Sequence, residues 1–136
     1  GYCVELIGYS IGYEPQGIAR LFNSFRLRKK LSNGPAFANR DRRLMLFALL
    51  CMQTKYRDMY DFLLRMRDQV TPDFLSGLCD GQTDASLRLS DEEREKFTAF
   101  ARIFCDIINL DKQDGISEEE CGVFVEVLRL SQITSK

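Results

Sequence analysis

The chain has 136 residues, a length that suits one domain with its own core or two small lobes sharing one. It is 45% hydrophobic with three prolines and nine glycines, so the composition predicts a globular protein and excludes a disordered one. The longest apolar run, residues 44–52, is too short to cross a bilayer, so no transmembrane segment is expected.

Charge is unevenly distributed along the chain, although the net charge is only −1. Residues 1–70 carry twelve Lys/Arg against six Asp/Glu, whereas residues 71–136 carry seven against fourteen. The chain therefore has a basic half and an acidic half, which predicts differently charged partners or ligands for the two.

The cysteines at positions 3, 51, 79, 105 and 121 are scattered, odd in number and never spaced as C-x-x-C. We therefore expect small buried thiols in a reducing, intracellular compartment such as the cytoplasm or cytoskeleton. Because the first residue is glycine, the alternative of an organelle, reached after removal of a targeting segment, is kept. Histidine is absent, which removes the commonest zinc and copper ligand and the usual base of nucleophilic pairs.

The N-terminal third begins with residues 2–13, which are aromatic and β-branched with glycine interruptions. Two interpretations stay open for them, a short strand or an extended arm. Pro15 suits the first position of a helix whose apolar face is formed by residues 18, 21, 22 and 25. The basic segment 26–35 ends in N-G-P and predicts a loop after that helix.

The middle of the chain predicts three helices. The first, from about 39 to 52, is apolar on nearly all sides after Arg43, so we expect it to be the most buried element. A second covers 56–67, and Thr71 with Pro72 predicts the cap of a short third helix, 73–79. The methionines at 45, 52, 59 and 66 are spaced by seven residues, and we expect core positions rather than a target-binding groove.

The C-terminal part follows a polar stretch without periodicity. We therefore expect a linker over residues 80–90 between a lobe formed by 1–79 and a helix–loop–helix unit formed by 91–136. Two capping boxes, 90–93 and 117–120, open helices that end near residues 108 and 130.

Between these two helices lies the sequence NLDKQDGISEEE, residues 109–120. A twelve-residue EF-hand loop binds calcium through positions 1, 3, 5, 7, 9 and 12, of which position 7 uses its backbone carbonyl. Each of those positions carries an oxygen donor here: Asn109, Asp111, Gln113, Gly115, Ser117 and Glu120. Ile116 falls at position 8, where EF-hands have an apolar side chain.

The flanking helices agree with this assignment. EF-hands place apolar residues one, four, five and eight positions before the loop, and again at positions 13, 16, 17 and 20. All eight match here: Ile108, Cys105, Phe104, Ala101, Cys121, Phe124, Val125 and Leu128. Over residues 97–130 the chain therefore resembles the EF-hand (calmodulin-like) superfamily. The resemblance implies an all-α fold of EF-hand-like helix–loop–helix units, with the extended N-terminal arm still open.

The loop departs from the family pattern at two positions. Asn109 stands where aspartate is usual, and Asp114 stands at position 6, where a glycine normally makes the sharp turn. Among the candidate ligands only Asp111 and Glu120 carry formal charge, so the resemblance implies a weak or vestigial Ca²⁺ site. The alternative, a loop that binds no metal, is not excluded by the sequence. No other cofactor is expected. Weaker matches starting at Arg26 and Arg67 predict metal-free hands upstream.

A cluster of basic residues in the first half could bind phosphate, an anionic surface or an acidic partner, or could be a solvated loop and helix end. Its members are Arg26, Arg28, Lys29, Lys30, Arg40, Arg42 and Arg43.

Taken as a whole, these features predict a protein that is not an enzyme, since neither G-x-G-x-x-G nor G-K-[ST] occurs and no catalytic pair is recognisable. We expect a protein-binding or regulatory module whose partner is another polypeptide, either a target helix or a neighbouring subunit. The alternative is a helical structural subunit of a larger complex, without metal dependence.

Overall fold

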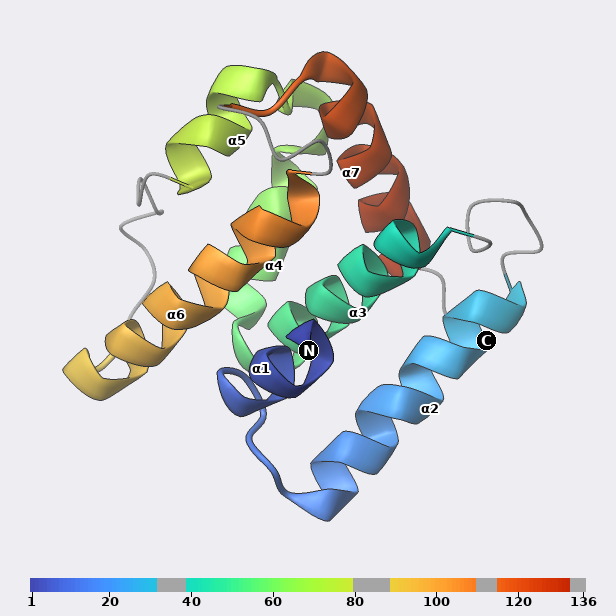
Figure 1. Cartoon of the computed structure of the whole chain (residues 1–136), viewed down its shortest axis with the longest axis vertical. Coiled ribbons are helices and arrows are strands. Elements are labelled where there is room, and N and C mark those ends of the chain that lie inside the picture. Colours follow the sequence, from blue (N-terminus) through green and yellow to red (C-terminus); the bar gives the residue numbers. More distant parts are fainter. Residues whose placement is uncertain (32–38, 80–88, 110–114, 133–136) are drawn as a thin grey trace.

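The computed structural model describes residues 1–31, 39–79, 89–109 and 115–132, and within these ranges it contains helices and no strand, so the all-α prediction is confirmed (Figure 1). In chain order the elements are α1 (Tyr2–Gly8), α2 (Pro15–Leu31), α3 (Arg40–Lys55), α4 (Arg57–Arg65), the 3-10 turn η2 (Arg67–Gln69), α5 (Pro72–Cys79), α6 (Asp91–Ile108) and α7 (Glu118–Ser131).

Helix α3 is the centre of the fold, as its apolar sequence predicts. Every residue from Met45 to Met52 is buried, and α3 contacts α1, α2, α4, α6 and α7. Figure 1 shows these helices arranged around it. The methionines at 45, 52 and 59 are buried core residues, which confirms that part of the prediction.

The N-terminal segment is helical, so the prediction of a strand or an extended arm is wrong. Helix α1 buries Leu6 and Ile7 against α3 and α6. At its start, the Tyr2 hydroxyl donates a hydrogen bond to the Asp106 carboxylate on α6. Burial against two helices outweighs the weak β preference of the local sequence, which is a context-dependent preference at best.

Helix α2 continues to Leu31, so the loop expected from Arg26 onward is also wrong for residues 26–31. Arginine, lysine and leucine are good helix formers, and the N-G-P sequence at 33–35 lies outside the described residues. The side chain of Arg28 attaches this last part of α2 to α7. Its Nε donates to the Ser131 carbonyl oxygen on α7 over 2.8 Å.

The predicted helix starts are confirmed by their capping hydrogen bonds. The Ser90 hydroxyl accepts from the backbone N–H of Glu93 at the start of α6. At α7 the full capping box is present: Ser117 Oγ accepts from the Glu120 N–H, and the Glu120 carboxylate accepts from the Ser117 N–H. Thr71 caps α5 in the same manner, through the N–H of Phe74.

The helices before and after residues 80–88 share one hydrophobic core. Helix α3 contacts both α6 and α7, and a single cluster of buried side chains includes residues from all of them. Between α6 and α7, the ring of Phe104 meets that of Phe124 edge-on at 5.9 Å between centroids. Most of the expected linker, residues 80–88, lies outside the described residues.

Cysteine pairing departs from the prediction. Cys79 at the end of α5 and Cys105 on α6 form a disulfide, with their Cα atoms 5.7 Å apart, so the expectation of free thiols is wrong for this pair. Cys51 and Cys121 are free and buried, as expected, whereas Cys3 is exposed. Because disulfides persist under oxidising conditions, the pair weakens the basis for a reducing compartment, which stays a prediction.

Candidate functional site

The acidic loop is described at its two ends only. Asn109 follows the last residue of α6 and its N–H donates to the Cys105 carbonyl oxygen over 3.1 Å. Gly115 has a φ of +103°, a backbone conformation that favours glycine. Asp111 and Gln113 lie outside the described residues, so their position relative to the other four candidate ligands stays a prediction.

Ser117 and Glu120, the last two candidate ligands, are engaged in the start of α7. Glu120 is only 3% exposed, and its Oε1 lies 2.8 Å from the backbone nitrogen of Ser117. Within the described ranges, no three Asp, Glu, Cys or His side chains come close enough to hold a metal ion. Any calcium site therefore depends on Glu120 binding metal while it also caps the helix.

A cavity of about 710 Å³ adjoins the loop ends. Asn109, Gly115 and Ile116 line it together with the disulfide between Cys79 and Cys105. The cross-link therefore holds α5 against the part of α6 that leads directly into the acidic loop.

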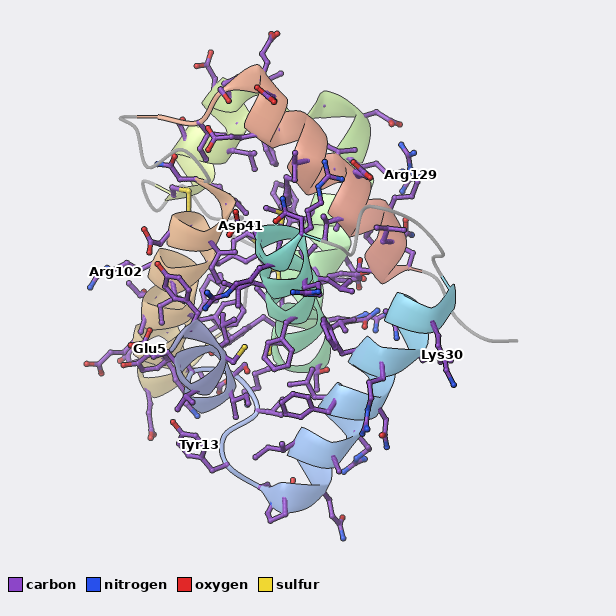
Figure 2. The ribbon with its side chains drawn as sticks, turned by 45° about the vertical axis from the view of Figure 1, so that its right-hand side comes forward. Glu5, Tyr13, Lys30, Asp41, Arg102 and Arg129 are labelled. Atoms are coloured by element: carbon purple, nitrogen blue, oxygen red, sulfur yellow. A yellow bond between two sulfur atoms is a disulfide. The ribbon has the colours of Figure 1, made fainter. Side chains whose placement is uncertain are left out.

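The predicted basic cluster is divided among different roles. Arg28 is 6% exposed and bonds to Ser131 and Ser24, so it is not available to a partner. Arg42 forms an ion pair with Glu126 of α7 at 2.8 Å. Arg26 and Lys30 are exposed on α2, and Figure 2 shows Lys30 pointing away from the other helices. The side chain of Lys29 is outside the described part.

Arg28 belongs to a buried polar network that joins three helices. Ser131, which is fully buried, accepts from Arg28 through its carbonyl oxygen, and its hydroxyl lies 2.6 Å from the Tyr60 hydroxyl of α4. Burial lowers the pKa of Arg28 and raises that of Tyr60. The network fixes the end of α2 to the end of α7.

Replacing Arg28 by methionine is expected to lower the free energy of unfolding by about 1–3 kcal/mol, because the buried Ser131 carbonyl loses a charged donor. The matched control is Arg26→Met, which removes the same charge from the exposed side of the same helix and should change stability by less than about 0.5 kcal/mol. Urea denaturation followed by circular dichroism measures both. Equal losses in the two variants would contradict a role of the network in stability.

The other two arginines of the cluster, Arg40 and Arg43, line a groove between α1, α2 and α3. The groove has a volume of about 300 Å³. Its lining is mainly apolar, and its residues come from the start of α1, the middle of α2 and the first half of α3: Gly1, Tyr2, Cys3, Val4, Phe22, Phe25, Arg40, Arg43, Leu44 and Phe47.

The floor and the walls of this groove are built differently. Phe47 of α3 is buried at the base of the groove, where it contacts the rings of Phe22 and Phe25 of α2 at centroid distances of 5.4 and 5.8 Å. In contrast, Val4 is 59% exposed and Phe22 is 38% exposed. The groove therefore presents apolar side chains to solvent above a packed base.

Sequence reasoning missed the groove, because it treated residues 2–13 as a strand or arm. A helical signal was present: Tyr2 and Leu6, and likewise Cys3 and Ile7, are spaced by four. Phe22 and Phe25 were placed correctly on one helical face. Their partial exposure could not be foreseen, because it depends on how far α2 lies from α1.

No protein-family model, curated protein or solved structure that was compared with this chain matches it. The described helices also include none that is long and apolar enough to cross a membrane. Function is therefore inferred from the described residues and their geometry.

Proposed function

We propose that this protein is a non-catalytic helical module that binds an apolar segment of another polypeptide in the groove between α1, α2 and α3. One observation carries the proposal: the large hydrophobic side chains that are exposed in the described residues all lie within the first 22 positions. They are Val4, Tyr9, Tyr13 and Phe22.

Concentrated apolar exposure beside a concave surface is typical of binding sites. Single exposed hydrophobic residues are common on protein surfaces, but Val4 and Phe22 line the same groove, which supports an interaction site there. Helical modules bind amphipathic partner helices in such grooves, with a few apolar side chains as anchors. The volume of about 300 Å³ is at the lower end for ligand pockets, which suits anchor side chains.

The available nucleophiles favour binding over catalysis. Burial raises the pKa of Cys51 to about 12, and burial followed by the charges of Glu120 and Glu118 raises that of Cys121. Both thiols are therefore protonated at neutral pH and unreactive. Histidine, the commonest base that activates a hydroxyl, is absent from the sequence.

Selection of displayed helical peptides of about 16 residues against the purified chain tests the proposal, since that length is sufficient for a marginally stable helix. Selected peptides are expected to bind Val4→Ser/Phe22→Ser at least about tenfold more weakly than wild type, because two apolar contacts are lost. Tyr9→Ser is the matched control. It removes an aromatic side chain that is 39% exposed, about as much as Phe22, but does not line the groove, and affinity should not change.

Peptides that bind wild type and Val4→Ser/Phe22→Ser equally would place the binding site elsewhere and overturn the proposal. If the groove instead closed against a second copy of this chain, sedimentation would show a dimer that the double substitution dissociates. That result would favour the structural-subunit alternative.

We also propose, separately, that the loop of residues 109–120 binds Ca²⁺ weakly. The support is local: Gly115 provides a positive φ one position after the usual glycine, and α6 and α7 end and begin at the positions expected for the resemblance. With two formal carboxylates among the candidate ligands, we expect a dissociation constant of about 10⁻⁴ M or weaker.

Calorimetric titration with Ca²⁺ tests this second proposal, with Glu120→Gln as the variant. Glutamine keeps an oxygen that accepts from the Ser117 N–H, so the helix cap survives while the carboxylate charge is lost. Heat of binding is expected from wild type and not from the variant. Identical heats from both proteins would contradict the calcium proposal and leave the groove proposal unaffected.

A further inference from the structure

The disulfide between Cys79 and Cys105 lies in surroundings that differ from those of the other cysteines. Both of its residues are partly exposed, and both line the cavity of about 710 Å³ beside the ends of the acidic loop. Cys51 and Cys121 are buried free thiols, and Cys3 lines the separate groove between α1, α2 and α3. A small reductant can therefore reach the bond from solvent while the core around the buried thiols stays folded.

The bond joins two helices that are held in the fold to different degrees. Helix α6 has 18 residues, and five of its large apolar side chains are buried, so its position does not require the cross-link. Helix α5 has only eight residues, of which Leu75 and Leu78 are buried. A helix of this length is unstable in isolation, so α5 depends on its attachments to the rest of the protein.

The attachment of α5 to α6 at the cavity is mainly covalent. The residues of α5 that line the cavity are Ser76 and Cys79, which are three apart and therefore lie on one face of the helix. Neither offers a large apolar side chain to α6. The other attachments point elsewhere: the ring of Phe74 lies 6.0 Å from that of Phe62 on α4, between centroids, and the Thr71 hydroxyl caps the first turn. Figure 1 shows α5 at the edge of the molecule, where it can move away without displacing another helix.

We propose that the Cys79–Cys105 bond is a redox-sensitive switch, which a dithiol reductant opens in the folded protein and whose opening releases α5 from α6. One thiolate of the reductant attacks one sulfur of the bond, and the other cysteine leaves as a thiolate and takes up a proton. The second thiol of the reductant then displaces the first cysteine. The protein gains two thiols and the reductant becomes a disulfide, so electrons and protons balance. The switch is independent of the groove and of the calcium proposal.

Opening of the switch changes the surface of the protein reversibly. Leu75 and Leu78, which are buried in the cross-linked form, become accessible when α5 leaves α6. Oxidation restores the same bond, because Cys51 and Cys121 are buried and burial raises the pKa of both thiols, so they do not compete. Cys3 lies on α1, in the separate groove.

Native-state labelling tests the first step, the opening of the bond in the folded protein. The full chain is treated with dithiothreitol at neutral pH without denaturant and then with iodoacetamide, and the labelled cysteines are identified by mass spectrometry. We expect Cys79 and Cys105 to be labelled together with Cys3, while Cys51 and Cys121 stay unlabelled. The two buried thiols are the matched control, because they report global unfolding of the same molecules. Labelling of all five cysteines at one common rate would show that the bond opens only on unfolding and would overturn the proposal.

Hydrogen exchange followed by mass spectrometry tests the second step, the release of α5. In the reduced protein the amides of α5 should exchange at least about tenfold faster than in the cross-linked protein, while those of α3 stay protected. Cys79→Ser/Cys105→Ser should show the fast exchange with or without dithiothreitol, and Cys3→Ser should behave as wild type. If the double variant does not fold, reduced wild type gives the same measurement. Unchanged protection of α5 after reduction would contradict the release, and exchange that stays fast after re-oxidation would contradict a reversible switch.

Discussion

Replacing Phe104 by alanine is expected to lower the free energy of unfolding by about 3–5 kcal/mol, a large effect for a single substitution. Phe104 is almost completely buried between α6 and α7, with its ring edge-on to Phe124 and stacked on Phe100 at 6.4 Å. Truncation removes its apolar burial and leaves a cavity that the neighbouring helices can only partly fill.

Urea denaturation with an unchanged m-value provides the measurement for Phe104. Phe22→Ala is the matched control, since it removes the same side chain from a half-exposed position and should cost considerably less. Phe104→Leu should retain most of the stability because it fills most of the volume. If Phe104→Ala and Phe22→Ala cost the same, Phe104 does not join α6 to α7 in the core.

Removing the disulfide is expected to lower the free energy of unfolding by about 3.5 kcal/mol and Tm by about 10–15 °C. Cys79 and Cys105 are separated by 26 positions, so the cross-link restricts a loop of moderate length in the unfolded chain. The double variant Cys79→Ser/Cys105→Ser measures the effect by thermal denaturation. Adding a reducing agent to wild type should reproduce it.

Cys3→Ser is the control for the disulfide, because Cys3 is exposed and not cross-linked, and its replacement should leave Tm unchanged. Labelling by a thiol reagent gives a second readout. In the folded, non-reduced protein Cys3 should react, while Cys51 and Cys121 should react only after unfolding. A Tm that is the same with and without reducing agent would contradict the cross-link.

Much of the helical organisation could be predicted from local sequence patterns. The starts of α6 and α7 follow from Ser90 and Ser117, because a capping hydroxyl and a backbone N–H three residues later interact whatever lies around them. The central position of α3 follows from its apolar composition, since a helix without a polar face can be stable in water only when surrounded by others.

The errors occurred where contacts distant in sequence decide the local structure. Residues 2–8 are helical because Leu6 and Ile7 are buried against α3 and α6. Helix α2 extends past Arg26 while Arg28 bonds to Ser131, which is 103 positions away. The prediction of free thiols was wrong for the same reason, since no local sequence pattern indicates that Cys79 lies next to Cys105.

The sequence alone determined the class of fold, the main helix starts and the apolar faces, because periodicity and capping act within a few residues. It also predicted the acidic loop 109–120, of which the structure describes the ends. Tertiary packing divides the basic cluster among different surroundings. Arg28 bonds α2 to α7 and Arg42 pairs α3 with α7, whereas Arg40 and Arg43 line the apolar groove between α1, α2 and α3. Side chains that are alike in sequence acquire different roles because burial and pairing depend on neighbours that folding brings together.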